Sequence, residues 1–141
     1  MRLFLDTSAL LKRYVREAGS ETVDEVLARA EAVAVSVLAW PESVSALARL
    51  RREAALDEGA VKRLKAAIVR DLGAMDVCEL TPWVLQRAVA CLERHALRTL
   101  DALHLGCAMA WRAELFVSAD RRQLAAAAAE GLAVQAVAAG A

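Results

Sequence analysis

Arg2-Leu3-Phe4-Leu5-Asp6-Thr7-Ser8 is the stretch that decides the fold of this 141-residue chain. Its apolar run stops at an acid, and a helical pattern begins at Ala9. A short apolar run that ends in small polar residues and enters a helix is typical of a strand, a turn and a helix. In a parallel α/β sheet this order puts Asp6 at the carboxyl end of a strand, where such folds keep their sites.

The rest of the chain alternates in the same way between short apolar runs and helical segments. Further strands are predicted at 32–37, 75–80 and 115–117, with an edge strand at 133–137. Helices are predicted at 9–15, 20–30, 41–52, 57–72, 82–95, 100–112 and 120–130. The expected helix caps are Thr7 or Ser8, Ser20, Thr81 and Thr99. Strands separated by helices predict a single α/β domain over residues 1–141, with a mostly parallel, buried sheet.

Composition sets limits on the class of protein. Hydrophobic residues make up 58% of the chain and many are alanine, which suits tightly packed helices and a buried subunit interface. Lys and Arg number 18 and Asp and Glu number 18, so a nucleic-acid surface would have to be a local patch. The three cysteines lack Cys-x-x-Cys spacing and are expected to be buried in a reducing cytoplasm. No targeting segment is seen, and no apolar run approaches the ~18 residues of a membrane span.

Four acids stand at junctions between strands and helices: Asp6, Glu42, Asp101 and Asp120. Taken singly, each has an ordinary structural interpretation, because an acid before a helix or in its first turn caps it or favours its dipole. Taken together, they are predicted to meet at one edge of a parallel sheet and to repel one another. A hard divalent cation would remove that repulsion, bind a phosphodiester and generate a hydroxide nucleophile. No glycine-rich phosphate loop is present, which argues against a bound nucleoside triphosphate.

The ordered acids and their neighbours resemble the acidic signature of PIN-domain ribonucleases. The resemblance is carried by Leu5-Asp6-Thr7-Ser8-Ala9-Leu10, by Glu42, by Arg98-Thr99-Leu100-Asp101-Ala102-Leu103-His104-Leu105 and by Ser118-Ala119-Asp120. It covers nearly the whole chain and is closest to the short VapC-type toxins of VapBC toxin–antitoxin pairs. One departure is Trp40-Pro41 directly before Glu42, where the family leads us to expect less bulky residues; it bears on where that helix begins.

The resemblance implies a three-layer α/β/α domain that acts as a Mg²⁺- or Mn²⁺-dependent endoribonuclease in the cytoplasm. It would leave 3′-hydroxyl and 5′-phosphate ends. The implied metal ligands are Asp6, Glu42 and Asp101, with Asp120 completing the quartet, while Ser8 and Ser118 match small polar positions that support the site. The implied partners are an RNA substrate, a small antitoxin that holds the toxin inactive, and a second copy of the chain in a homodimer.

Other residues and other classes of protein bear on this interpretation. His104 follows Asp101 by one turn, and its spacing favours packing on the sheet over metal ligation. Basic residues near the acids are candidates for phosphate contacts: Lys12, Arg13, Arg98, Arg121 and Arg122. A haloacid-dehalogenase-like phosphatase would also begin with a strand ending in Asp, but it needs a second acid where Ser8 stands. A housekeeping PIN-type nuclease in RNA processing, and a non-catalytic interaction module that keeps the acids as caps, remain as alternatives.

Overall fold

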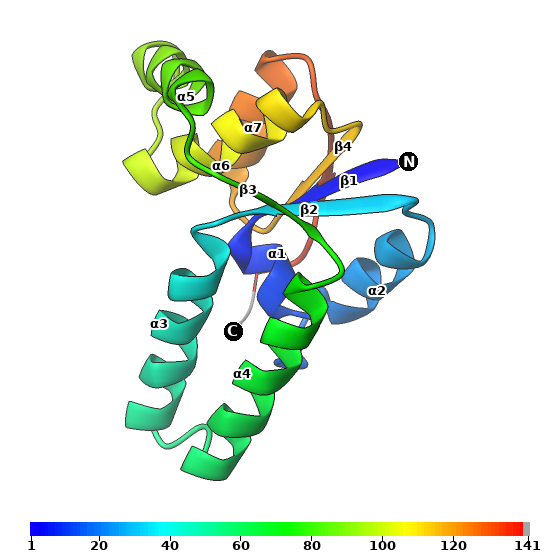
Figure 1. Ribbon diagram of the computed structural model, residues 1–141, viewed down its shortest axis with the longest axis vertical. Coiled ribbons are helices and arrows are strands. Elements are labelled where there is room, and N and C mark those ends of the chain that lie inside the picture. Colours follow the sequence, from blue (N-terminus) through cyan, green and yellow to red (C-terminus); the bar gives the residue numbers. More distant parts are fainter. Residues whose placement is uncertain (140–141) are drawn as a thin grey trace.

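The chain folds around a five-stranded sheet in which every pair of neighbouring strands is parallel. The computed structural model describes residues 1–139 and gives the strand order β3-β2-β1-β4-β5 (Figure 1). The strands are β1 (Arg2–Leu5), β2 (Ala32–Ser36), β3 (Asp76–Cys78), β4 (Leu115–Ser118) and β5 (Ala133–Ala136). The helices are α1 (Thr7–Leu11), α2 (Ser20–Ala28), α3 (Ala39–Arg52), α4 (Glu58–Leu72), α5 (Pro82–Arg94), α6 (Thr99–Trp111) and α7 (Arg121–Ala129). The predicted parallel α/β fold is confirmed.

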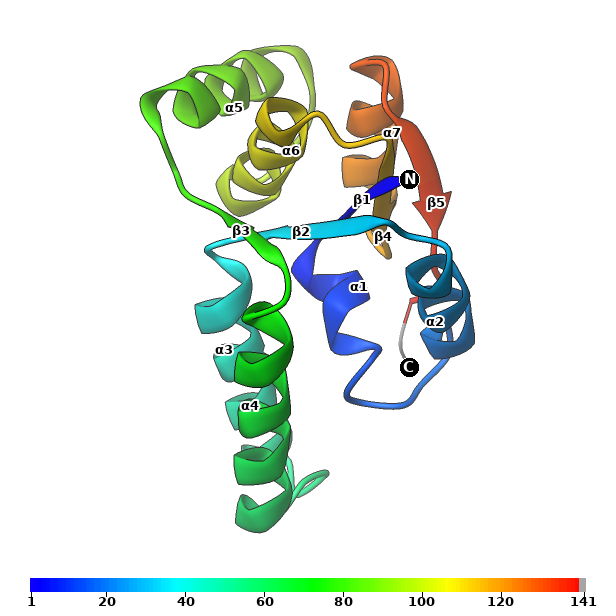
Figure 2. The ribbon, with the colours of Figure 1, turned by 45° about the vertical axis from the view of Figure 1, so that its right-hand side comes forward.

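Helices cover both faces of the sheet, which gives three layers. Helices α5, α6 and α7 lie on one face, and α1 and α2 lie on the other (Figures 1 and 2). Helices α3 and α4 pair with each other and extend away from the sheet on the side of α1 (Figure 2). Because successive side chains of a strand point to opposite faces, each strand feeds two separate cores.

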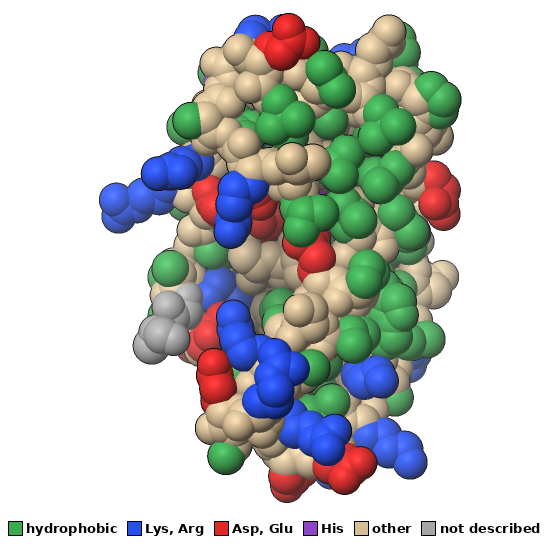
Figure 3. Space-filling view, turned by 90° about the vertical axis from the view of Figure 1, so that its left-hand side faces the viewer, with side chains coloured by type: hydrophobic (Ala, Val, Ile, Leu, Met, Phe, Trp, Pro, Cys, Tyr) green, Lys and Arg blue, Asp and Glu red, His purple; other side chains and the backbone are tan. Residues whose placement is uncertain are grey.

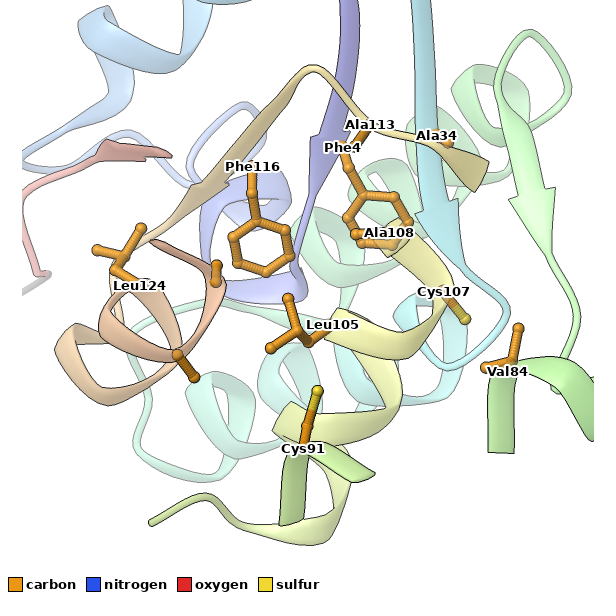
Figure 4. Close-up of a cluster of buried hydrophobic side chains, with 12 residues drawn as sticks. Phe4, Ala34, Val84, Cys91, Leu105, Cys107, Ala108, Ala113, Phe116 and Leu124 are labelled. Carbon is orange, nitrogen blue, oxygen red and sulfur yellow. The ribbon is translucent and has the colours of Figure 1, made fainter. Parts of the chain in front are cut away.

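The alternation is visible along β1 and β4. Phe4 and Phe116 point to the face of α5, α6 and α7, where their rings stack with centroids 5.8 Å apart and Leu105 packs against them (Figure 4). Leu5 and Val117 point to the other face and pack with residues of α1 and α2. All five side chains are buried, so the register of the two central strands is fixed by apolar burial on both faces.

Small residues let α5 and α6 approach closely, as the alanine-rich composition predicted. A side chain added at Gly106 would place its Cβ 2.8 Å from the carbonyl oxygen of Val84 and 3.3 Å from the Cβ of Ala88. Those distances are too short for any larger residue without a shift of backbone. Gly106 therefore keeps α6, which carries Asp101, close to α5.

Of the four predicted helix caps, one was correct and three were wrong. Thr81 caps α5, and Pro82 is in its first turn, as predicted. The helix after β1 begins at Thr7 and is capped by Asp6, so the prediction of Thr7 or Ser8 as the cap was wrong. Ser20 and Thr99 are the first helical residues of α2 and α6, and not the caps; Gly19, with φ of +91°, and Arg98 occupy those positions.

The bounds of the first helix and the burial of the cysteines also bear on the predictions. Helix α1 ends at Leu11, four residues before the predicted end, and a turn follows.

Cys91 and Cys107 are buried and Cys78 is half-buried, and all three are free, which largely confirms the prediction of buried, unpaired thiols. In the part of the chain that is described, no helix has the length and apolar character needed to span a membrane.

Candidate active site

The four acids singled out in the sequence line one cleft at the carboxyl ends of the central strands. The cleft has a volume of about 430 Å³. Asp6 follows β1, Glu42 lies in the first turn of α3, Asp101 lies in the first turn of α6, and Asp120 follows β4. Figure 3 shows this face of the molecule, with acidic side chains around a hollow and basic side chains flanking them. Four elements far apart in sequence therefore bring their carboxylates to one place.

Asp6 is the buried centre of this cleft. Its side chain is only 5% exposed, and its oxygens accept hydrogen bonds from the Ala9 N–H at 2.9 Å and from the hydroxyls of Ser8 and Ser118 at 2.7 and 3.0 Å. Burial raises the pKa of Asp6 above the ordinary aspartate value, although these hydrogen bonds act in the opposite direction. The site therefore holds a carboxylate whose charge is only partly compensated.

Ser8 and Ser118 fix Asp6 and also join the loops around it. Ser8 Oγ accepts the N–H of Ala119 at 3.0 Å, which ties the start of α1 to the loop after β4. Ser118 Oγ lies 2.8 Å from Gln123 Oε1 and accepts the N–H of Asp120 at 2.9 Å. The supporting positions suggested by the family resemblance thus both contact the carboxylate of Asp6.

Glu42 is held by two donors, Thr7 and His104. Thr7 Oγ1 donates to Glu42 Oε1 at 2.7 Å, and His104 Nε2 forms a short contact with the same oxygen. Burial alone would raise the pKa of Glu42, but the hydrogen bonds from His104 and Thr7 outweigh it and hold the pKa below the usual glutamate value. Helix α3 begins at Ala39, before Trp40-Pro41, so the bulky pair does not displace Glu42 from the cleft.

His104 packs in the core and also contacts a residue of the site. The sequence analysis weighed packing on the sheet against metal ligation, and it did not consider a contact with Glu42. Its side chain is 2% exposed, as expected for a helix residue packed on the sheet. Within residues 1–139 its Nδ1 atom has no hydrogen-bond partner. An unpaired buried N–H is costly, so the favoured tautomer of the imidazole carries its proton on Nε2 and donates it to Glu42.

Asp101 and Asp120 face a cation supplied by the chain itself. Arg98 Nε lies 3.2 Å from Asp101 Oδ2, and its Nη2 lies 4.0 Å from Asp120 Oδ2. The hydrogen bond to Asp101 and the charges of Asp101, Asp120 and Glu42 raise the pKa of Arg98 above its ordinary value. Asp120 also caps α7 by accepting the N–H of Gln123 at 2.9 Å, so its structural role as a cap is real and coexists with its place in the cleft.

The donor set suits a hard cation, but the carboxylates do not form a ready-made chelate. Over residues 1–139, no three acidic, histidine or cysteine side chains lie close enough together to hold a metal ion. Glu42 is turned toward His104, and Asp101 toward Arg98. Carboxylate oxygens are nevertheless the ligands that Mg²⁺ and Mn²⁺ prefer, and Asp6 is a buried charge that a cation would stabilise. Metal binding would thus require side-chain rotations at the rim, where Arg98 is 81% exposed.

Three residues that line the cleft or support it from below were not assigned a functional role from the sequence. These are Thr7, His104 and Gln123. Gln123 is fully buried, and its Nε2 donates to the backbone oxygen of Asp101 at 3.1 Å, so it joins α7 to α6 below the acids. A polar residue among the alanines of α7 was the available signal for Gln123.

Two predicted phosphate-contact residues are bonded to other parts of the chain. Arg13 pairs with Asp71 and lines a separate groove beside α2 and α4. Lys12 borders the cleft, but its ammonium is buried and donates to Glu17 and to the Ala18 oxygen. Arg98, Arg121 and Arg122 do lie beside the acids. Three of the five predicted basic residues therefore remain candidates for contact with a substrate.

Comparison with known proteins assigns the family. Residues 3–129 match the model of the PIN domain. Ribonuclease VapC49 of Mycobacterium tuberculosis (strain ATCC 25618 / H37Rv) is 34% identical over 108 residues, which cover 77% of this chain and 75% of that protein. This match does not favour the phosphatase alternative.

Solved structures share the fold at lower sequence identity. A toxin–antitoxin complex from Klebsiella pneumoniae superposes with a TM-score of 0.65 at 17% identity, covering 87% of this chain and 90% of that one. VapC20 of Mycobacterium tuberculosis, described as a sarcin–ricin loop cleaving toxin, superposes with a TM-score of 0.67 at 19% identity over 92% and 95% of the two chains. The match over 127 of its residues, the identity to VapC49 and the shared fold show that the chain belongs to the PIN-domain family, among the VapC ribonucleases.

Proposed function

We propose that this chain is a Mg²⁺- or Mn²⁺-dependent endoribonuclease and the toxin of a VapBC-type toxin–antitoxin pair. The observation that carries the proposal is the buried carboxylate of Asp6, which is held by neutral donors in a cleft with three further acids. The relatives named Ribonuclease VapC45 and Ribonuclease VapC49 supply the reaction class. A cleft at the carboxyl edge of the sheet, open to solvent and lined by acids and arginines, supports hydrolysis of an exposed phosphodiester.

In this proposal the ligands are Asp6, Glu42, Asp101 and Asp120. When bound, the cation would lower the pKa of a coordinated water and neutralise charge on the phosphate. Ser8 and Ser118 hold the Asp6 carboxylate in one orientation, and Thr7 with His104 keeps Glu42 ionised and directed toward the cleft. The water oxygen bonds to phosphorus while the bond to the ribose 3′ oxygen breaks. A water proton ends on the 3′ oxygen, which leaves a 3′-hydroxyl and a 5′-phosphate.

The partners follow from the same assignment. We infer that a small antitoxin binds this chain and that its polypeptide enters the acidic cleft, and that RNA is the substrate. We also infer a homodimer. A candidate surface for it is the outer face of α5, where Trp83, Leu85 and Val89 are exposed although they are large and apolar. Exposed apolar side chains in one patch favour association with another protein surface.

Cleavage of RNA by the pure chain tests the enzymatic part of the proposal. We expect cleavage of total cellular RNA with Mn²⁺ or Mg²⁺, none with EDTA, and products that carry 5′-phosphates. Asp6→Asn should abolish cleavage, because the change keeps size and shape but removes a charge that binds metal. The matched control is Asp24→Asn, which should cleave like the wild type. Asp24 lies on α2 and forms a surface ion pair with Arg16, away from the cleft. A folded Asp6→Asn chain that cleaves as fast as wild type would refute the mechanism.

Growth assays test the toxin part separately. Expression of the chain alone should arrest growth, and co-expression of the small protein encoded beside its gene should restore it. Unimpaired growth in the presence of abundant, active chain would instead favour a housekeeping nuclease in RNA processing. A pure chain that binds RNA but cleaves none under any divalent cation would favour the non-catalytic interaction module.

A further inference from the structure

A second depression adjoins the acidic cleft. It has a volume of about 420 Å³ and is lined by residues 96–98, Asp101 and residues 119–122. Four of these residues also line the acidic cleft: Arg98, Asp101, Ala119 and Asp120. The two hollows are therefore neighbours, and Arg98 with its ion-pair partners Asp101 and Asp120 lies between them.

The second depression differs from the acidic cleft in its charge. Three arginines border it, Arg98 from the loop before α6 and Arg121 and Arg122 from the first turn of α7. Its only acids within residues 1–139 are Asp101 and Asp120, the two that also face the cleft. A cation taken up by Asp101 and Asp120 would leave three arginines around this hollow without acidic partners in it.

Arg98 is placed to change partners. Its guanidinium touches Asp101 through Nε at 3.2 Å and lies 4.0 Å from Asp120, but its side chain is 81% exposed. Exposed ion pairs contribute little to stability, so Arg98 can exchange its carboxylate partners for a phosphate at little cost in free energy. A guanidinium also matches the geometry of a phosphate, with two parallel N–H donors.

We propose that this second depression, the arginine depression, binds the RNA phosphodiester next to the one that is cut, with Arg98, Arg121 and Arg122 as its phosphate ligands. The inference rests on the proposed function, because it places the scissile phosphate among the four acids. Continuity of the two hollows favours a nucleic-acid strand over an isolated anion, since a strand carries a second phosphate beside the first. Arg98 serves as an internal cation for Asp101 and Asp120 before metal binds, and as a phosphate ligand afterwards.

The proposal predicts opposite effects of one substitution on two ligands. Arg98→Gln should bind Mn²⁺ more tightly, by up to about fivefold, because an exposed competing ion pair is removed. The same variant should bind RNA more weakly by about twofold to fivefold for the loss of one exposed phosphate contact. Arg122→Gln should weaken RNA binding to a similar extent and change the Mn²⁺ affinity less, because it forms no ion pair with Asp101 or Asp120 within residues 1–139. A residue that only supports the fold would not produce this split.

The experiment measures binding of a fluorescein-labelled single-stranded RNA of random sequence by anisotropy over a series of KCl concentrations. It is done in Ca²⁺, a hard cation that carboxylates bind, and again in EDTA, where Arg98 keeps its ion pairs with Asp101 and Asp120. Wild type is compared with Arg98→Gln, Arg121→Gln, Arg122→Gln and a matched control, Arg29→Gln, an exposed arginine at the opposite edge of the sheet. Each phosphate ligand should contribute about 0.7 to the slope of log Kd against log salt, so each arginine variant except the control should lose about that much in Ca²⁺. In EDTA the loss for Arg98→Gln should be smaller, because Arg98 is then paired with Asp101 and Asp120. Mn²⁺ affinity is measured separately by titration calorimetry.

Failures of the two proposals give different results. If wild type cleaves RNA but all three variants keep the Kd and salt slope of Arg29→Gln, the arginine depression is refuted and the nuclease assignment stands. If wild type neither cleaves nor binds the RNA, both are refuted. An Arg98→Gln chain that binds Mn²⁺ no better than Arg122→Gln overturns the partner exchange. A fluorescent polyglutamate peptide that loses affinity in the variants while RNA binding is unchanged would assign the depression to an acidic peptide instead.

Discussion

Asp6→Asn separates the electrostatic role of Asp6 from its role as a helix cap. Asn keeps the acceptor oxygen for the Ala9 N–H, and its amide can donate to Ser118 Oγ, which can then donate to Gln123. The hydrogen-bond network is therefore preserved while the charge is removed. Since burial raises the pKa of Asp6, the folded protein favours the neutral side chain more than the unfolded chain does, and Asn should stabilise the metal-free protein at neutral pH.

The expected magnitude follows from two opposing contributions. Burial of an ionised carboxylate costs several kcal/mol, and the extra strength of charge-assisted over neutral hydrogen bonds, about 1 kcal/mol for each of three, offsets much of that cost. The net gain for Asn is on the order of 1 kcal/mol. For a chain of this length that raises the melting temperature in EDTA by about 3 °C.

Mn²⁺ should reverse the order of the two proteins. At a Mn²⁺ concentration of about 100 times the wild-type Kd, wild type gains about 2.7 kcal/mol, or about 8 °C. If the loss of Asp6 weakens binding about a hundredfold, the variant gains only about 0.4 kcal/mol, or about 1 °C.

The pH dependence in EDTA has a definite sign. A carboxyl group with a raised pKa contributes stability that is present below the unfolded value of 3.8 and is lost as the pH rises through the folded pKa. The stability of Asp6→Asn relative to wild type should therefore increase from acid toward neutral pH. Thermal and urea melts measure both effects. A variant that is less stable than wild type in EDTA, yet gains as much from Mn²⁺, would refute this reasoning.

Three further predictions concern the surrounding structure. His104→Leu removes the donor that holds Glu42 and should weaken Mn²⁺ binding by about tenfold to a hundredfold; calorimetry that finds the wild-type affinity would exclude this supporting role. Gly106→Ala should lower the free energy of unfolding by about 1–3 kcal/mol in urea melts, because its Cβ would meet the Val84 oxygen. Gly59→Ala in α4, whose nearest neighbours are side-chain atoms at 3.4 Å, is the control and should be neutral or stabilising. Light scattering at micromolar concentration should show a dimer for wild type and more monomer for Trp83→Glu, since Trp83 is 56% exposed on α5; a wild-type monomer would rule the dimer out.

The sequence predicted those parts of the site that depend on short segments of chain. Asp6 and Asp120 each follow a strand and precede a helix within a few residues, so local pattern was enough to place them at the sheet edge. Glu42 was predicted with more difficulty because Trp40-Pro41 precede it, yet α3 begins before that pair. The parallel sheet followed from the alternation of elements, and its strand order required the structure.

Contacts between distant elements could not be predicted in this way. Glu42 and His104 are 62 residues apart, and their contact depends on the rotation of α3 and α6 about their own axes, which packing of both helices decides. The same holds for Arg98, whose partner Asp120 lies on another element, and for Gln123, which bonds the backbone of Asp101. One of the mispredicted helix caps has its reason in the site itself, because Asp6 takes the cap position of α1.

Direct titration of Mn²⁺ into the metal-free chain tests the central claim that four carboxylates from four elements form one cation site. Binding is measured by calorimetry for wild type, for Asp6→Asn, Glu42→Gln, Asp101→Asn and Asp120→Asn, and for the control Asp24→Asn on α2. We predict that each variant of the quartet binds Mn²⁺ more weakly than wild type and that the control binds it equally well. Wild-type affinity in the four variants, or no Mn²⁺ binding by the wild-type chain, would contradict the claim.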